Sequence, residues 1–226
     1  MNLPSMRAPR APRLASLAVL ALAASSWLIA GCSDMETIEA EVEPEDHRMV
    51  VMPMKDRLQY HFDSQRGIGL ARLITERILA ERKKLGEDAM DVVAFEELEE
   101  QVAKMHTDPK DLKPEDVGRM VKADYVLVGN IESFEPRIPG DVGFMRGRAT
   151  CSFKVIDVAK PSRPVFAKKL DIKFPEETRT STGVLQTADA DVAKIEAGLL
   201  EVLAKKIGEV FYPHDEKKDR NPGAGL

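Results

Sequence analysis

The hydrophobic pattern changes character halfway along the chain, and this change limits the folds that the chain can adopt. Apolar side chains occupy every second position between residues 149 and 155, and a similar alternation returns with Phe166, Leu170, Ile172 and Phe174. Period-two alternation gives a strand one apolar and one wet face, which is typical of antiparallel sheets. The short connection 157–164 carries two prolines. The second half therefore predicts an antiparallel hairpin.

The first half of the chain shows uninterrupted apolar runs that alternate with helical patterns. Short apolar runs are typical of buried strands, whereas apolar residues repeated every three or four positions are typical of helices. These patterns predict strands at 48–53, 90–95 and 124–134, and helices at 65–85, at 96–106, from Pro114 onward and at 189–211. The predicted order is β-α-β-α-α-β-β-β-α. This is an α/β fold whose mixed sheet has about five strands, with helices packed on it, a C-terminal antiparallel hairpin and a long final helix.

The two longest predicted helices each carry one apolar stripe that we expect to face the core. In the helix at 65–85 the stripe holds Leu70, Ile74, Ile78 and Leu85. In the final helix it holds Val192, Ile195, Leu199, Leu203 and Val210.

A basic and then apolar leader precedes the rest of the chain. Residues 1–31 contain three arginines and no acidic residue, and 14–30 is an uncharged stretch, a layout typical of a secretory signal peptide. It closes on Ile29, Ala30, Gly31 and Cys32, which resemble the lipobox of bacterial lipoproteins. The resemblance implies a lipid thioether on Cys32 and an acyl chain such as palmitate on its new amino group. An uncleaved membrane-spanning helix is the alternative, because the 17-residue stretch lies at the short edge of the spanning range.

The residue after the lipobox cysteine bears on which membrane holds the anchor. In the sorting rule of Gram-negative lipoproteins, aspartate directly after the cysteine retains the protein in the inner membrane. Here Ser33 follows and Asp34 comes one residue later. The resemblance therefore implies the periplasmic face of the outer membrane, with inner-membrane retention as the alternative. Acylation would leave Cys151 without a disulfide partner, and we interpret Cys151 as a core residue.

The distribution of charged residues divides the rest of the chain into a tether, a folded domain and a tail. Residues 33–47 hold seven acids and neither Lys nor Arg, so 32–47 is predicted to be a lipidated, flexible acidic tether. Residues 213–226 are charged and then Pro/Gly-rich, which predicts a disordered tail after a folded domain at 48–212. Without the leader the chain has 30 basic and 38 acidic residues, a net charge of −8, which disfavours nucleic acid as a partner.

Several local phrases, taken in order, resemble the CsgG-like and LpoB-like (penicillin-binding protein activator) bacterial lipoproteins. They are VVMPM in the first strand, the glycine-led helix from Gly67, DVVAFEELEE, KADYVLVGNIESF and FKVIDV. The resemblance covers roughly residues 47–212 and implies the fold shared with the amino-terminal domain of TolB proteins. One departure is Lys122, which stands where the family often has glycine.

The resemblance implies a non-catalytic, lipid-anchored periplasmic protein that binds an envelope protein, as an assembly or activation factor for a cell-wall synthase or secretion machinery. The first alternative is a subunit of an oligomeric CsgG-like outer-membrane export channel, so a homo-oligomer stays open. Segments 54–66 and 135–146 are the insertion points for membrane hairpins, and both lack the roughly 9 to 11 alternating residues that each membrane strand needs. The second alternative is a small-ligand binder or enzyme that uses the 54–66 loop with His61.

Loops at the carboxyl ends of strands are the expected binding surface in such sheets. Because aromatic and arginine side chains dominate interface energetics, the candidate partner-binding residues are Tyr60, Phe62, Arg66, Phe144 and Arg146. The long polar loop 175–187 is a further candidate. For any single one of these residues, a loop that merely covers the edge of the sheet is at least as good an interpretation as a partner-binding role.

Motifs for catalysis or cofactors are missing from the sequence. The Gly67-Ile68-Gly69 turn has Arg72 where a dinucleotide fingerprint needs its third glycine. The four histidines are too far apart in sequence to pair as metal ligands, and no Gly-x-Ser-x-Gly elbow occurs. We therefore predict no enzyme activity, no metal and no cofactor beyond the covalent lipid on Cys32.

Overall fold

The structure is a computed structural model that describes residues 35–42, 47–56, 64–105, 112–137, 146–175 and 192–217. Its packing divides the chain into two units, Met1–Asp34 and Met35–Leu226. All described residues belong to the second unit. The leader and the lipobox cysteine Cys32 therefore lie outside the described residues.

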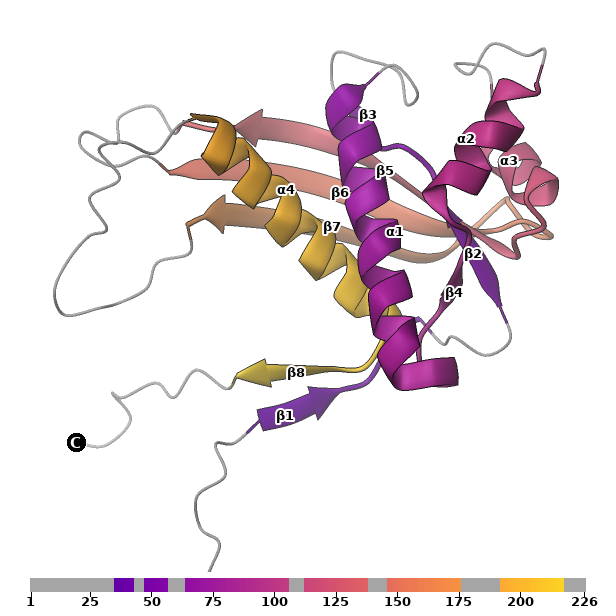
Figure 1. Cartoon of the computed structure of the whole chain (residues 1–226), viewed down its shortest axis with the longest axis horizontal. Coiled ribbons are helices and arrows are strands. Elements are labelled where there is room, and N and C mark those ends of the chain that lie inside the picture. Colours follow the sequence, from indigo (N-terminus) through magenta and orange to yellow (C-terminus); the bar gives the residue numbers. More distant parts are fainter. Residues whose placement is uncertain are drawn as a thin grey trace, which may run out of the picture. The chain divides into compact units, whose positions relative to one another are not determined.

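A six-stranded mixed sheet organises the second unit (Figure 1). Five strands follow the order β4-β2-β5-β6-β7, and the short β3 also pairs with β5. Their bounds are β2 Arg48–Val51, β3 Lys55–Asp56, β4 Asp91–Val92, β5 Tyr125–Glu135, β6 Gly147–Asp157 and β7 Pro164–Phe174. β2 is parallel to β4 and β5, β3 is parallel to β5, and β5, β6 and β7 form antiparallel pairs. The predicted mixed sheet and hairpin are confirmed, with β3 as an additional strand.

Within the described residues, four helices complete the predicted order. They are α1 Gln65–Leu85, α2 Phe95–Ala103, α3 Pro114–Met120 and α4 Val192–Gly208, and 3₁₀ turns follow at Gly86–Asp88 and Glu209–Phe211. Arginine and lysine in the last turn of α1 complement its dipole, and Gly86 ends that helix with a positive φ of 68°. Within the part of the chain that the structure describes, no helix is long and apolar enough to cross a membrane.

The two faces of the β5–β6–β7 region are different. On β6, Ala149, Cys151 and Val155 are buried under α1 and α4, and we call this the helix face (Figure 1). The intervening side chains of β6 point to the other side, which we call the outer face. Gly147 marks how closely α4 approaches, because a Cβ there would lie 2.6 Å from Ile195.

The predicted apolar stripes form the core with one exception. Leu70, Ile74 and Ile78 of α1 are buried, as are the α4 residues Ile195, Leu199 and Leu203. Leu85 packs at the margin of the core. Val192 is the exception, because it stands at the first position of α4 and is 43% exposed.

A separate pair of strands corrects the prediction for both ends of the domain. β1 (Met35–Ile38) pairs antiparallel with β8 (His214–Lys217). Val42 is buried, and its N–H donates to the carbonyl of Val210 at 3.2 Å. The predictions of a flexible tether and a disordered tail were therefore wrong for these residues. Backbone groups pair whatever their side chains are, so acidic composition did not prevent a strand.

Candidate partner-binding site

Several elements meet at one end of the sheet, which we call the loop end. β3 and β5 finish here, β6 begins here, and α1 and α4 start here. Three segments outside the described residues, 57–63, 138–145 and 176–191, connect to these elements. They contain three of the predicted partner-binding residues, Tyr60, Phe62 and Phe144. The described part of the candidate site therefore consists of residues on β3, β5, β6, α1 and α4 at this end.

Arg66 lies at the centre of the loop end. Its Nη1 donates to Oδ2 of Asp56 at 2.7 Å, and its guanidinium carbon stands 4.3 Å from the centroid of the Phe134 ring. A carboxylate oxygen of Glu196, in the first turns of α4, lies 4.0 Å away. The Arg66 side chain is still 34% exposed, whereas Asp56 is 14% exposed. The guanidinium is thus held by three elements and keeps an open edge toward solvent.

A bulge in β5 places Phe134 beneath Arg66. The pairing of β5 with β6 shifts between Ile131 and Ser133, so that one extra residue, Glu132, is inserted. Without the shift, strict alternation would turn Phe134 to the outer face. With it, Phe134 pairs with Ala149 on the helix face, where it meets the guanidinium. Bulges commonly re-aim side chains in this way, and nothing in the sequence indicated it.

The start of α1 fixes the position of Arg66. The Ser64 hydroxyl oxygen accepts a hydrogen bond from the Gly67 N–H at 2.9 Å and so caps the helix. Gly67 also touches the backbone before β3, because the Met54 N–H donates to its carbonyl at 3.2 Å. A Cβ on Gly67 would lie 1.9 Å from the Met54 oxygen. Glycine is therefore required for α1 to bring Arg66 within reach of Asp56.

A hollow of about 380 Å³ opens beside this cluster. Its walls include Asp56, Arg66, Ser133, Phe134 and Glu135. The volume lies within the range of ligand-sized clefts. An aromatic ring, a guanidinium and carboxylates around one concavity can take up a polar or cationic side chain of a partner. Asp56, Phe134 and Glu196 were missed from the sequence because their role depends on long-range packing.

Arg146 is the other described member of the predicted set. It stands directly before β6, half-buried, at the loop end where β5 finishes and α4 starts. Arg66 and Arg146 thus belong to the same end of the sheet, and a role for them in partner binding stays a prediction.

The described residues also bear on catalytic chemistry. Cys151 is fully buried, as predicted, and its burial, with a smaller effect of Glu132, raises the pKa of its thiol to about 12. A thiol protonated at neutral pH is a poor nucleophile. Among the described residues no group of three His, Cys, Asp or Glu side chains could hold a metal ion.

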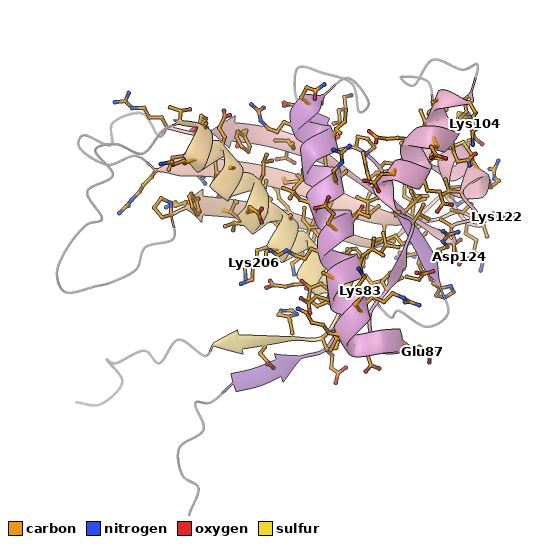
Figure 2. The ribbon with its side chains drawn as sticks, viewed as in Figure 1. Lys83, Glu87, Lys104, Lys122, Asp124 and Lys206 are labelled. Carbon is orange, nitrogen blue, oxygen red and sulfur yellow. The ribbon has the colours of Figure 1, made fainter. Side chains whose placement is uncertain are left out.

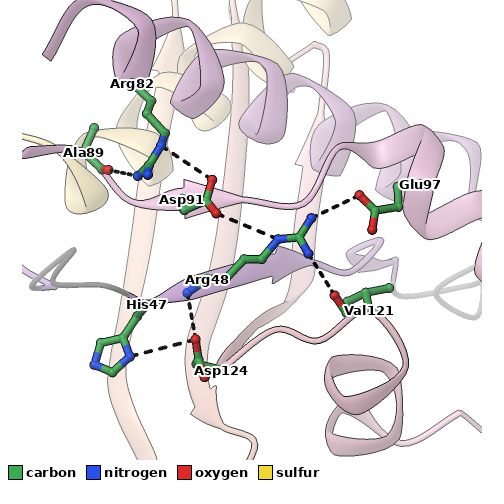
Figure 3. Close-up of polar contacts among 8 residues, drawn as sticks. All are labelled: His47, Arg48, Arg82, Ala89, Asp91, Glu97, Val121 and Asp124. Carbon is green, nitrogen blue, oxygen red and sulfur yellow. Dashed lines mark hydrogen bonds and ion pairs between the residues drawn. The ribbon is translucent and has the colours of Figure 1, made fainter. Parts of the chain in front are cut away.

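A second polar cluster lies at the opposite end of the parallel strands (Figure 3). The Arg48 guanidinium donates to Glu97 at 3.1 Å and to the carbonyl of Val121 at 3.3 Å, and it lies 3.9 Å from Asp91. Arg82 of α1 approaches the same Asp91 at 3.5 Å. These contacts join β2, β4, α1, α2 and the end of α3. We interpret this cluster as structural, because its charges are mutually paired.

Comparison with known proteins gives weak likenesses. No protein-family model and no curated protein sequence matches the chain. Among solved structures, a PelC dodecamer from Paraburkholderia phytofirmans is 13% identical with a TM-score of 0.42, over 79% of this chain and 96% of that one. Lipoprotein GNA1162 from Neisseria meningitidis is 12% identical with a TM-score of 0.41, over 72% and 99%.

A third structure with some likeness is LpoB of E. coli, which is 12% identical with a TM-score of 0.38, over 75% of this chain and 83% of that one. At such identities and TM-scores the likenesses carry no conclusion about family or function. The resemblance to CsgG-like and TolB proteins stays a prediction.

Proposed function

We propose that this protein is a non-catalytic, lipid-anchored binding protein of the bacterial envelope that docks a partner protein through its loop end. The observation that carries the proposal is the position of Arg66. Its guanidinium is fixed by Asp56 and Phe134 and keeps an exposed edge beside a hollow. The described elements β3, β5, β6, α1 and α4 all begin or end at this end of the sheet.

Such an arginine suits protein recognition for an entropic reason. An unrestrained arginine loses rotamer freedom on binding, roughly 0.5 to 1.5 kcal/mol for a flexible side chain. Asp56 and Phe134 hold the Arg66 side chain before any partner arrives, so much of this loss has already occurred in folding. Planar guanidinium groups also offer several donors in a fixed geometry. Arginine is accordingly frequent among residues that dominate interfaces.

The anchor part of the proposal rests on Ile29, Ala30, Gly31 and Cys32. A lipidated Cys32 followed by Ser33 favours the periplasmic face of the outer membrane. Two or three acyl chains bind a bilayer far more stably than one, because each buried methylene contributes about 0.8 kcal/mol. The partner would then be an envelope protein, in cell-wall synthesis or in secretion. The burial of Cys151 supports a non-catalytic role.

A site-specific crosslinking experiment tests the docking site. A photo-crosslinking amino acid at position 62, in the segment that joins β3 to α1, should trap one envelope protein in intact cells. The same group at Lys83, which is exposed on the last turns of α1, is the matched control (Figure 2). Substituting Arg66→Ala should weaken the adduct from position 62. An adduct of equal yield from position 83, or one insensitive to Arg66→Ala, would contradict docking at the loop end.

Labelling with palmitate tests the anchor separately. Wild-type protein should carry the label and sediment with outer membranes, whereas Cys32→Ala should lose both. A Cys151→Ala variant is the control, because the thiol of Cys151 is buried and should not affect labelling. Label that survives Cys32→Ala would remove the lipid anchor from the proposal while leaving the loop-end site to be judged by crosslinking.

A further inference from the structure

The hairpin of β6 and β7 carries a charge opposite to that of the whole chain. Residues 146–175 contain eight Lys and Arg residues and two aspartates, a net charge of +6, whereas the full chain carries −5. The basic residues are Arg146, Arg148, Lys154, Lys160, Arg163, Lys168, Lys169 and Lys173. A local charge reversal of this size produces a positive potential that attracts anionic groups.

The strand register places part of this charge on the outer face. Lys55 of β3, Asn130 of β5, Ser152 of β6 and Lys169 of β7 form one cross-strand row. The next row holds Val128, Lys154 and Ala167. Side chains opposite each other in a sheet point to the same side. The outer face therefore carries three lysines around a polar centre with apolar neighbours.

These lysines differ in their ionic partners. Lys169 pairs with Glu132 at 2.5 Å. Hydrogen bonds from Lys169 and, to a smaller extent, from Ser152 hold the pKa of the Glu132 carboxyl below its usual value. Arg148 and Asp171 also pair on this face. Lys55 and Lys154 form no ion pair with any residue that the structure describes. Their ammonium groups are thus available to an outside carboxylate.

A hollow of about 640 Å³ lies between these two lysines. Val128, Ile156, Ala167 and Pro114 contribute apolar surface to its lining, and Asn130 and Ser152 contribute polar groups. α3 covers the adjoining part of the same face, where a Cβ on Gly118 would lie 2.8 Å from Val126. The hollow begins where the cover of α3 ends. Its size is comparable to that of known ligand pockets.

We propose that the outer face of β5, β6 and β7 binds an acidic, extended segment of a partner protein. Carboxylates of that segment pair with Lys55 and Lys154, and an apolar side chain between them fills the hollow. This surface is distinct from the loop end, so the inference goes beyond the proposed docking site and needs neither the lipid anchor nor Arg66.

The arrangement of charges distinguishes a peptide from a membrane surface. Glu132 and Asp171 share the outer face with the lysines. A flat anionic bilayer would bring its headgroups against these carboxylates as well as against the lysines. An extended peptide places its carboxylates singly, about 7 Å apart on one side of the strand. It can reach Lys55 and Lys154 and insert a side chain into a concave surface.

Fluorescence anisotropy with the full chain in neutral detergent micelles tests this inference. The probe is a labelled twelve-residue peptide of glutamates with two central leucines, and the matched probe has glutamine in place of glutamate. We expect saturable binding of the acidic probe alone. The double variant Lys55→Gln/Lys154→Gln should weaken it about tenfold, which corresponds to about 1.4 kcal/mol, or about 0.7 kcal/mol for each of two exposed ion pairs.

The control variant removes two positive charges elsewhere. Lys83→Gln/Lys104→Gln alters two exposed lysines on α1 and at the end of α2 (Figure 2), and it should change the affinity less than about twofold. Absence of binding to the acidic probe, or an equal loss in both double variants, would overturn the proposal. Binding to phosphatidylglycerol vesicles without binding to the peptide would assign the face to a membrane instead. Circular dichroism establishes that each variant is folded.

Discussion

Lys122 holds a backbone conformation that side chains rarely adopt. Its φ of 55° lies in the left-handed region, directly after α3, where its N–H donates to the Arg119 carbonyl at 3.3 Å. Glycine is the usual residue at such a helix end. Glycine has no Cβ and reaches a positive φ without this strain.

We predict that Lys122→Gly stabilises the fold. Relief of the left-handed strain, about 1 to 2 kcal/mol, exceeds the added chain entropy of glycine, about 0.5 to 1 kcal/mol. Urea unfolding should show a gain of about 0.5 to 1 kcal/mol. Lys104→Gly is the control, because Lys104 is also exposed but has a φ of −81° (Figure 2). A loss of stability in both variants would contradict the prediction.

Cys151 gives a pH dependence with a definite sign. Burial raises the pKa of its thiol from 9.0 to about 12, so the folded state binds the proton more tightly than the unfolded chain. The stabilisation is complete below pH 9 and is lost as the pH rises toward 12. The slope in that window is at most about 1.4 kcal/mol for each pH unit.

The measurement compares wild type with Cys151→Ala by urea unfolding at pH 7 and at pH 10.5. Other titrating groups are common to both proteins, so the difference between them isolates the thiol. We expect wild type to lose more stability than the variant over this interval. Parallel losses in the two proteins would show that the thiol of Cys151 titrates normally in the folded state.

Among the elements, the contact between α1 and the backbone before β3 tolerates the least change. Gly67→Ala places a methyl group 1.9 Å from the Met54 carbonyl oxygen, and neither partner is a flexible side chain. We expect a loss of about 1 to 3 kcal/mol by overpacking. Gly69→Ala, in the same turn, has no atom within 4 Å and should gain up to about 1 kcal/mol. Equal effects of the two substitutions in thermal unfolding would contradict this account.

β1 and β8 depend on each other and little on the sheet. The two strands pair at four positions, and an isolated two-stranded ribbon is marginally stable. Deleting residues 214–226 should expose the amides of 35–38 to rapid hydrogen exchange, with little change in the stability of the sheet. Deleting 218–226, which spares β8, should preserve their protection. Protection of 35–38 in both truncated chains would show that β1 is held by something other than β8.

For the molecule as a whole, the local pattern of apolar residues predicted most of the architecture. α1 matches its predicted bounds because its apolar stripe and Gly86 define both face and end. The alternation on β6 and β7 likewise predicted the hairpin. β1 and β8 were not predictable, because their residues pair across almost the whole chain through backbone groups. Arg66 could be chosen as a candidate from the sequence. Its contact with Phe134 could not be predicted, because it depends on the bulge at Glu132 and no residue type at that position indicates a bulge.

The pairing of β1 with β8 has a mechanical consequence. Met35 lies opposite Lys217, so the chain enters and leaves this ribbon at the same end. A force pulling residues 34 and 218 apart would act across the hydrogen bonds of one pair at a time, since these bonds run perpendicular to the strands. The ribbon would open like a zipper at low force. A pull along the ribbon would load all four pairs together in shear.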